Sequence, residues 1–203
     1  MREDTVVDLL RHGEPVGGRR YRGQTDDPLS EKGWAQMWAA VGAACPWTAI
    51  VTSPLSRCRA FAEALAERHG REVHLEPRFQ EIAFGEWEGR TSAELTRDDP
   101  HRLLRFWDAP EAHRPPGAEP LADFERRVVA AWEEVLRRFQ GRHVLVVGHA
   151  GMMRMVVRHA LDMPRERLFR LQIPNAGLTR IRVREGGGVR LPTVEFHARL
   201  TLT

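Results

Sequence analysis

Three short apolar segments recur along the chain, and each is followed by a stretch in which apolar residues return every three or four positions. The apolar segments are TVVDLL (5–10), AIVTS (49–53) and HVLVVG (143–148). The stretches that follow them are 31–44, 56–69 and 151–161. Runs of β-branched residues bounded by turn residues are typical of buried strands, and the longer spacing is typical of amphipathic helices. Strands that alternate with helices predict a mostly parallel sheet covered by helices on both faces.

The rest of the chain adds a long helix, an insertion and a hairpin. The clearest helical pattern spans 121–139 and consists of Leu121, Phe124, Val128, Trp132, Val135 and Phe139. Between 86 and 120 the pattern weakens into short helical pieces and a proline-rich stretch, so we expect a small helical insertion, or lid, over the C-terminal edge of the sheet. The segment 168–196 predicts a strand, a turn and a hairpin that reverses at 186–188. The predicted fold is a three-layer α/β sandwich with residues 1–203 in one domain.

Composition indicates a soluble globular protein. The 203 residues are 42% hydrophobic and 29% charged, and charges of both signs are interspersed with a net charge of only +3. That balance gives no reason to expect a nucleic-acid partner. No apolar run approaches the roughly 20 residues that a membrane span needs, and the acidic start does not resemble a secretory signal. The two cysteines, Cys45 and Cys58, form no CxxC motif or disulfide framework. We expect a reduced, cytoplasmic protein, either monomeric or homodimeric.

Basic side chains follow each of the three predicted strands. Arg11 and His12 follow the first strand, Arg57 comes soon after the second, and His149 directly follows the third. Ligands of parallel sheets bind at the carboxyl ends of the strands, so we expect these four side chains around one pocket. The planar fork of arginine matches the oxygens of a phosphate group and makes strong charge-assisted hydrogen bonds to them. The sequence therefore predicts a site for a phosphate dianion.

These residue types also suggest a reaction. A neutral imidazole is a competent nucleophile toward phosphorus, and arginines can neutralise the charge that builds on the phosphoryl oxygens. The leaving group needs a proton, for which FQEIAFGEWEGR offers Glu81, Glu86 and Glu88. Apolar neighbours such as Phe84 and Trp87 would raise the pKa of a carboxyl and fit it for that role. The histidines show no metal-ligand spacing, and the chemistry requires neither a metal nor a cofactor.

Taken together, these motifs resemble the histidine phosphatase superfamily, also called phosphoglycerate-mutase-like. The matching segments, which cover most of 5–160 in the order of the family, are LLRHGE, TDDPLSEKG, VTSPLSRCRAFAEAL, EIAFGEWEG, PPGAEPLADFERRV and VLVVGHAG. The resemblance implies that His12 is the phosphorylated nucleophile and that Arg11 and Arg57 clamp the phosphate. It also implies that His149 is the second histidine of the phosphate pocket and that Glu81 is the proton donor.

The loop after His12 departs from the family pattern. The resemblance implies that Arg22 and Gly23 line the pocket. The family often carries Asn at the sixth position after the nucleophile, where this chain has Gly18, and the loop that follows is slightly shorter. One phosphate contact is therefore expected to be missing or to be replaced by Arg19, Arg20 or Arg22.

Within the family, the compact length and the stretches FGEWEG and VLVVGHAG look most like the α-ribazole phosphatase group. Mutases of the family usually carry a longer insertion and a tail, for which this chain has little room. The resemblance thus implies a phosphatase for phosphorylated small molecules, with α-ribazole 5′-phosphate as the leading substrate. A phosphoglycerate-mutase-type phosphotransferase stays open as an alternative, as does a weakly catalytic protein that binds a phosphorylated ligand.

Overall fold

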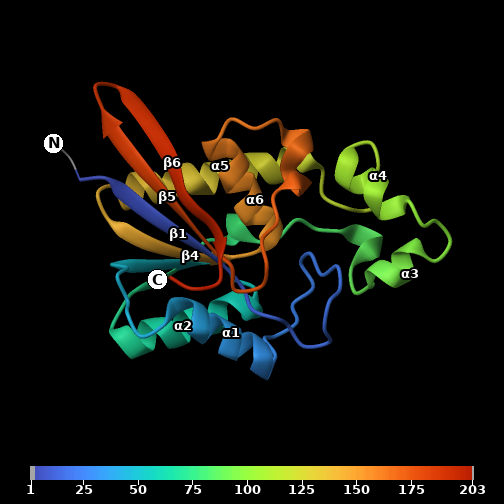
Figure 1. The fold of residues 1–203 in the computed structure, drawn as a ribbon, viewed down its shortest axis with the longest axis horizontal. Helices are drawn as coiled ribbons and strands as arrows, with labels where there is room; N and C mark the ends of the chain where they lie inside the picture. Colours follow the sequence, from blue (N-terminus) through green and yellow to red (C-terminus); the bar gives the residue numbers. More distant parts are fainter. Residues whose placement is uncertain (1–2, 203) are drawn as a thin grey trace.

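A six-stranded sheet organises the protein, whose computed structural model describes residues 3–202 (Figure 1). The strands are β1 (Thr5–Arg11), β2 (Ala49–Thr52), β3 (Val73–Leu75), β4 (His143–Gly148), β5 (Leu178–Gly186) and β6 (Val189–Arg199). Their spatial order is β3-β2-β4-β1-β5-β6. The first four strands in this order run parallel, whereas β5 pairs antiparallel with β1 and β6 pairs antiparallel with β5. The predicted mostly parallel α/β sheet is confirmed.

Helices cover both faces of the sheet, as a three-layer sandwich requires (Figure 1). One face carries α1 (Glu31–Val41) and α2 (Ser56–His69), and the other carries α5 (Leu121–Arg138) and α6 (Ala150–Ala160). Successive side chains of a strand point to opposite faces. In β1, Val7 and Leu9 therefore pack with α5 and α6, while Leu10 packs with α1 and α2. No helix among residues 3–202 is long and apolar enough to cross a bilayer.

The predicted helices are present, with small differences at their ends. All six apolar positions expected in 121–139 are buried, which explains the strong amphipathic pattern of α5. Helix α1 begins after Ser30, whose side chain accepts a hydrogen bond from the Gly33 N–H. The helix ends at Val41, before the predicted end at 44, because Gly42 turns the backbone to a positive φ of 66°.

The insertion contains η2 (Gly85–Trp87), α3 (Ser92–Thr96) and α4 (Arg102–Asp108), and it lies beyond the carboxyl ends of the parallel strands (Figure 1). A small apolar cluster of Trp87, Leu95, Leu103 and Phe106 holds it together. Tyr21 packs against this cluster from the loop that follows β1. The insertion is therefore joined to the segment just after His12.

The prediction of a strand at the start of 168–196 is wrong. Residues Arg165–Arg170 form a short 3₁₀ helix, η3, that begins after Pro164. A strand there could not pair with β1, because β1 already pairs with β4 and β5. Leu168 instead fills the core, and the Phe169 ring packs 4.9 Å from that of Phe106. Two short elements were not predicted, β3 and the 3₁₀ helix η1 (Pro77–Phe79), because neither has an apolar run.

A buried carboxylate ties the central strands to one another. Asp8 of β1 is fully buried, and Arg180 of β5 donates to both of its oxygens at 2.7 and 2.9 Å. The Trp47 indole N–H donates at 2.7 Å, and His143 Nε2 of β4 lies 2.9 Å away. Burial by itself would raise the pKa of Asp8, but the hydrogen bonds of His143, Arg180 and Trp47 outweigh it and lower the pKa. Asp8 therefore stabilises the fold as an anion.

Replacing Asp8 by Ala should lower the free energy of unfolding by roughly 3 kcal/mol at pH 7, because Arg180 loses its buried partner. Because the pKa of Asp8 is lower in the folded state, its contribution is present above about pH 4 and is lost as the pH falls through the folded-state pKa. Urea denaturation at pH 7 and at pH 3 measures both effects. Asp4→Ala is the control, since half-buried Asp4 lies 3.5 Å or more from its arginines and should contribute under about 1 kcal/mol. Equal losses for the two variants would contradict the prediction.

Candidate active site

Three neighbouring strands end at the same level and bring the predicted residues together. The Ser53 N–H, just after β2, donates to the Val147 carbonyl of β4 at 3.0 Å. The His12 N–H, just after β1, donates to the Gly148 carbonyl of β4 at 2.9 Å. His149 follows Gly148 directly, so the register of the sheet places Ser53, His12 and His149 side by side.

His12 is held with one ring nitrogen free. Its Nδ1 lies 2.7 Å from the Gly13 carbonyl, and since a carbonyl only accepts hydrogen bonds, Nδ1 must carry the proton. The lone pair is then on Nε2. The ring is buried, and burial, followed by the charges of Arg11 and Arg57, holds the pKa of His12 well below its usual value. The imidazole is therefore neutral and available as a nucleophile.

His149 lies beside His12 and is fully buried, with 5.2 Å between the two ring centroids. Its Nε2 is 2.8 Å from the Ser53 hydroxyl, and the Cys58 Sγ is 3.6 Å from the same nitrogen. Burial, followed by the charge of Arg57, holds the pKa of His149 well below its usual value. Burial also raises the pKa of the Cys58 thiol, so sulfur stays protonated. Two neutral imidazoles thus face the same space.

The two arginines are held by main-chain carbonyl oxygens. Arg57 is fully buried at the start of α2, and it donates to the carbonyls of Gly23 and Thr25, each at 2.7 Å. Arg11 donates to the Ile173 carbonyl at 2.6 Å. Within residues 3–202 no carboxylate forms an ion pair with either guanidinium, and the buried Nε of each has no partner. Burial, followed by the nearby charge of Arg154, lowers the pKa of Arg11 to about 10, so it remains a cation at neutral pH.

Glu81 is the glutamate that joins this group. Its Oε2 accepts from the Gly151 N–H at 2.9 Å, and its Oε1 accepts from the N–H groups of Met152 at 3.2 Å and Ile82 at 3.0 Å. Besides any apolar neighbours, the first turn of α6 faces this carboxylate with N–H donors. A Cβ on Gly151 would lie 2.3 Å from Oε1, so this close approach requires glycine. Glu86 is exposed on the insertion.

The loop after His12 contributes both predicted residues, in different ways. Arg22 is buried, donates to Asp27 at 2.8 Å and to the Val16 carbonyl at 2.6 Å, and its charge reaches His12. Gly23 contributes its carbonyl to Arg57. Of the other two arginines considered in place of the missing Asn, Arg20 donates to the Gly89 carbonyl at 2.7 Å. Arg19 is exposed, and its charge reaches Arg11.

Sequence reasoning missed Arg154 of α6. Its Nε donates to the Leu171 carbonyl at 2.7 Å, burial lowers its pKa, and its charge reaches Arg11, Glu81 and Tyr21. A third guanidinium therefore lies near that of Arg11. The available signal was helical spacing, since Arg154 follows Gly151 by three residues and so lies on the helix face that meets Glu81.

The insertion also forms an open pocket of about 370 Å³, lined by residues that include Trp87, Leu95, Arg90 and Arg105. None of the seven predicted site residues lines it. Across residues 3–202, no three His, Cys, Asp or Glu side chains are grouped so that they could hold a metal ion.

Comparison with known proteins identifies the family. The sequence model of the histidine phosphatase superfamily, branch 1, matches residues 7–193. The chain belongs to this superfamily. It is 37% identical over 176 residues to the bifunctional protein Rv2228c of Mycobacterium tuberculosis, and the match covers 84% of the chain but only 48% of that protein. The chain thus spans about half the length of that relative. It is 33% identical to the probable phosphoglycerate mutase GpmB of Photorhabdus laumondii, covering 86% of the chain and 83% of GpmB.

Solved structures of the superfamily share the fold. A mycobacterial glucosyl-3-phosphoglycerate phosphatase superposes with a TM-score of 0.84 at 26% identity, covering 97% of the chain and 99% of that protein. A putative α-ribazole-5′-P phosphatase from Escherichia coli superposes with a TM-score of 0.81 at 21% identity, covering 98% of each chain. The second likeness concerns the fold alone. The relatives therefore include phosphatases and probable mutases of one superfamily.

The neutral state of His12 is open to direct measurement. In a nitrogen NMR titration, the His12 and His149 rings should still be neutral at about pH 6.5, where an ordinary histidine is half protonated. Arg57→Leu should raise both pKa values, since the charge of Arg57 disfavours the imidazolium of each ring, although burial remains. Arg59→Leu, which changes an exposed arginine of the same helix, should leave both rings unaltered. A wild-type His12 that titrates at or above its ordinary pKa would overturn this account of the pocket.

Proposed function

We propose that this protein hydrolyses phosphomonoesters of small molecules through a phosphohistidine intermediate on His12. One observation carries the proposal. The guanidinium groups of Arg11 and Arg57 are bound by carbonyl oxygens and by no carboxylate among the described residues, so their positive charge is available to a dianion beside a neutral imidazole. Nε2 of that imidazole carries the lone pair that the reaction needs.

In the first step, the His12 Nε2 lone pair attacks phosphorus and the ester P–O bond breaks. The departing alkoxide takes a proton from the Glu81 carboxyl, while Arg11 and Arg57 neutralise charge on the phosphoryl oxygens. In the second step, Glu81 removes a proton from a water molecule that attacks the phosphohistidine. The N–P bond then breaks, and inorganic phosphate and free Nε2 are released. Each proton that Glu81 gives is thus regained.

Glu81 is proposed as the acid because of its neighbours. Its charge reaches both Arg11 and Arg154, which puts the carboxyl at the edge of the phosphate pocket. Glu86 is exposed, and both carboxylate oxygens of Glu88 accept hydrogen bonds from the loop between β1 and α1. The contacts of Glu81 with Gly151 and Met152 hold it against the turn that directly follows His149.

Two substrate classes are proposed. The sequence resemblance favours α-ribazole 5′-phosphate. A specific observation favours a second class, phosphate esters whose alcohol carries a carboxylate, as in a phosphoglycerate. Arg154 is a third cation beside Arg11, it too is bound by a main-chain carbonyl, and one dianion does not need three guanidinium groups. The solved glucosyl-3-phosphoglycerate phosphatase and the probable mutases among the relatives also favour this class.

Hydrolysis is preferred over a mutase reaction because the chain has only a compact insertion to enclose an intermediate. A weakly catalytic protein that binds a phosphorylated ligand is the remaining alternative, kept open by Gly18 at the position where the family often has Asn. Turnover and the fate of the phosphoryl group separate the three.

The proposal predicts release of inorganic phosphate from p-nitrophenyl phosphate in excess EDTA, and acid-labile phosphate on His12 after a rapid quench. His12→Ala should abolish both signals, because it removes the Nε2 that is proposed to attack phosphorus. His101→Ala, which removes an exposed histidine of the insertion, should leave both unchanged. Loss of activity in EDTA, equal rates for wild type and His12→Ala, or phosphate trapped on serine would contradict the mechanism. Transfer of phosphate to 3-phosphoglycerate rather than to water would indicate a mutase.

A substrate panel tests the role of Arg154. The panel contains α-ribazole 5′-phosphate, glucosyl-3-phosphoglycerate, 3-phosphoglycerate and p-nitrophenyl phosphate. If Arg154 binds a carboxylate, Arg154→Leu should lower kcat/KM for the substrates with a carboxylate by about 10- to 100-fold, the effect of losing a charged hydrogen bond, and should spare the other two. Arg158→Leu is the matched control, because Arg158 follows one turn later on α6 and pairs with Glu125 instead. An equal loss for all four substrates would contradict the second substrate class.

A further inference from the structure

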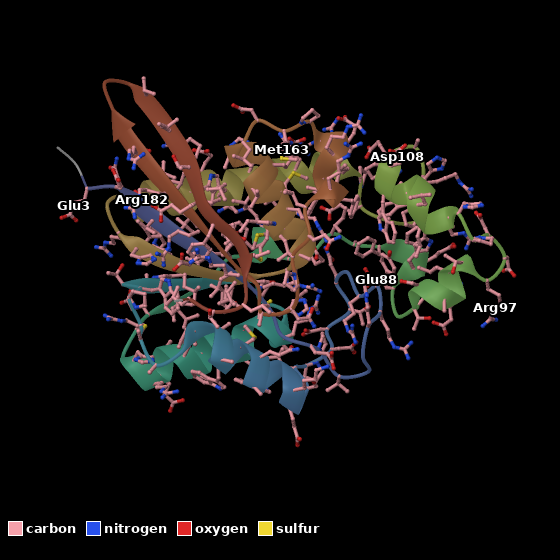
Figure 2. All side chains as sticks on the ribbon, viewed as in Figure 1. Glu3, Glu88, Arg97, Asp108, Met163 and Arg182 are labelled. Atoms are coloured by element: carbon pink, nitrogen blue, oxygen red, sulfur yellow. The ribbon has the colours of Figure 1, made fainter. Side chains whose placement is uncertain are left out.

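Glu88 lies where the insertion meets the loop between β1 and α1 (Figure 2). Its Oε2 accepts hydrogen bonds from the Thr25 N–H at 2.9 Å and from the Thr25 hydroxyl at 2.6 Å. Its Oε1 accepts from the Gln24 N–H at 3.1 Å and from the Phe84 N–H at 3.0 Å. One carboxylate therefore receives four donors, and three of them belong to two consecutive residues of the loop.

The same part of the loop also binds Arg57, through main-chain carbonyl oxygens. The peptide group between Gly23 and Gln24 donates its N–H to Glu88 and offers its carbonyl to Arg57 Nη2 at 2.7 Å. In a trans peptide the N–H and the C=O point in opposite directions, so an anchor on the N–H directs the carbonyl. Hydrogen bonds in such a chain also polarise one another, which makes the Gly23 carbonyl a better acceptor. The carboxylate thus acts on the guanidinium through one peptide group.

Two further observations fit this arrangement. A Cβ on Gly23 would lie 2.1 Å from Glu88 Oε1, so the loop can approach the carboxylate only with glycine at this position. At the other end of the loop, Asp26 accepts from the N–H and the hydroxyl of Ser56 at 2.7 and 2.8 Å, directly before Arg57. The loop is fixed to the insertion at one end and to the start of α2 at the other.

We propose that Glu88 is a positioning residue for Arg57, and that it couples the insertion to the phosphate pocket. It touches no reacting atom. By fixing the peptide plane between residues 23 and 24 and the backbone of Thr25, it keeps both carbonyls on the guanidinium and so keeps the free edge of Arg57 toward the anion. The inference rests on the proposed function only in that Arg57 binds the phosphoryl group.

The test compares Glu88→Gln with Glu94→Gln. Glu94 is a matched control because it accepts from the Thr91 N–H at 2.7 Å and from the Thr91 hydroxyl at 2.8 Å, the same pair of contacts within the same insertion, and it does not touch the loop. A glutamine in place of Glu88 turns one acceptor into a donor that faces N–H groups. We expect Glu88→Gln to weaken binding of inorganic phosphate about tenfold and to lower kcat/KM for p-nitrophenyl phosphate by about 10- to 100-fold, the scale of a small misplacement. Glu94→Gln should change neither.

A double-mutant cycle separates positioning from general stability. If Glu88 acts through Arg57, then Glu88→Gln should have little effect on phosphate binding once Arg57 is alanine. An unchanged effect in the Arg57→Ala background, or equal effects of Glu88→Gln and Glu94→Gln, would overturn the proposal. If Glu88→Gln does not fold, Thr25→Val removes only the hydroxyl contact and should give a smaller loss in the same direction, again absent without Arg57. A wild-type protein that binds phosphate but turns over no ester would defeat the proposed function and leave this test intact.

Discussion

The bonds between Arg57 and the carbonyls of Gly23 and Thr25, and between Arg11 and the carbonyl of Ile173, are the constraint on which the site depends. A carbonyl oxygen orients a guanidinium without cancelling its charge, whereas a carboxylate would do both. The pocket can therefore contain two fixed cations and remain electrically unsatisfied. A bound dianion would supply the negative charge that the pocket lacks, and this attraction is the physical basis of the proposed chemistry.

This constraint also explains the state of the histidines. The same positive charges that favour a bound phosphate, together with burial, disfavour protonation of His12 and His149. A single arrangement thus keeps the proposed nucleophile neutral and favours a bound dianion. The sheet makes the arrangement possible, because hydrogen bonds between neighbouring strands set the backbone of residues 12, 53 and 149 at one level. The buried Asp8 cluster lies deeper in the same strands and holds β1, β4 and β5 in register.

Much of the fold was predictable from local pattern. The parallel strands with long β-branched runs, the helices that follow them and the long amphipathic helix were expected and are present. Prediction failed for segments whose structure depends on their contacts with distant parts of the chain, because the local pattern contains no information about those contacts. The residues around Phe169 have a strand-like sequence, but Leu168 is buried in the core and Phe169 packs on Phe106 of the insertion. A three-residue strand such as β3 has too few apolar positions to be recognised.

For the site, the amino-acid sequence by itself determined which residue types follow the parallel strands, because strand ends can be read from local periodicity and parallel strands end at one edge. Residue types alone left three glutamates open, among which the family resemblance favoured Glu81, and they did not point to Arg154. Only the tertiary structure decided that Glu81 meets the first turn of α6, that Glu88 contacts the loop between β1 and α1, and that Arg154 lies near Arg11. Each of these contacts joins segments far apart in the chain, and the direction of a single peptide group or helix turn sets it. Local periodicity does not encode those directions.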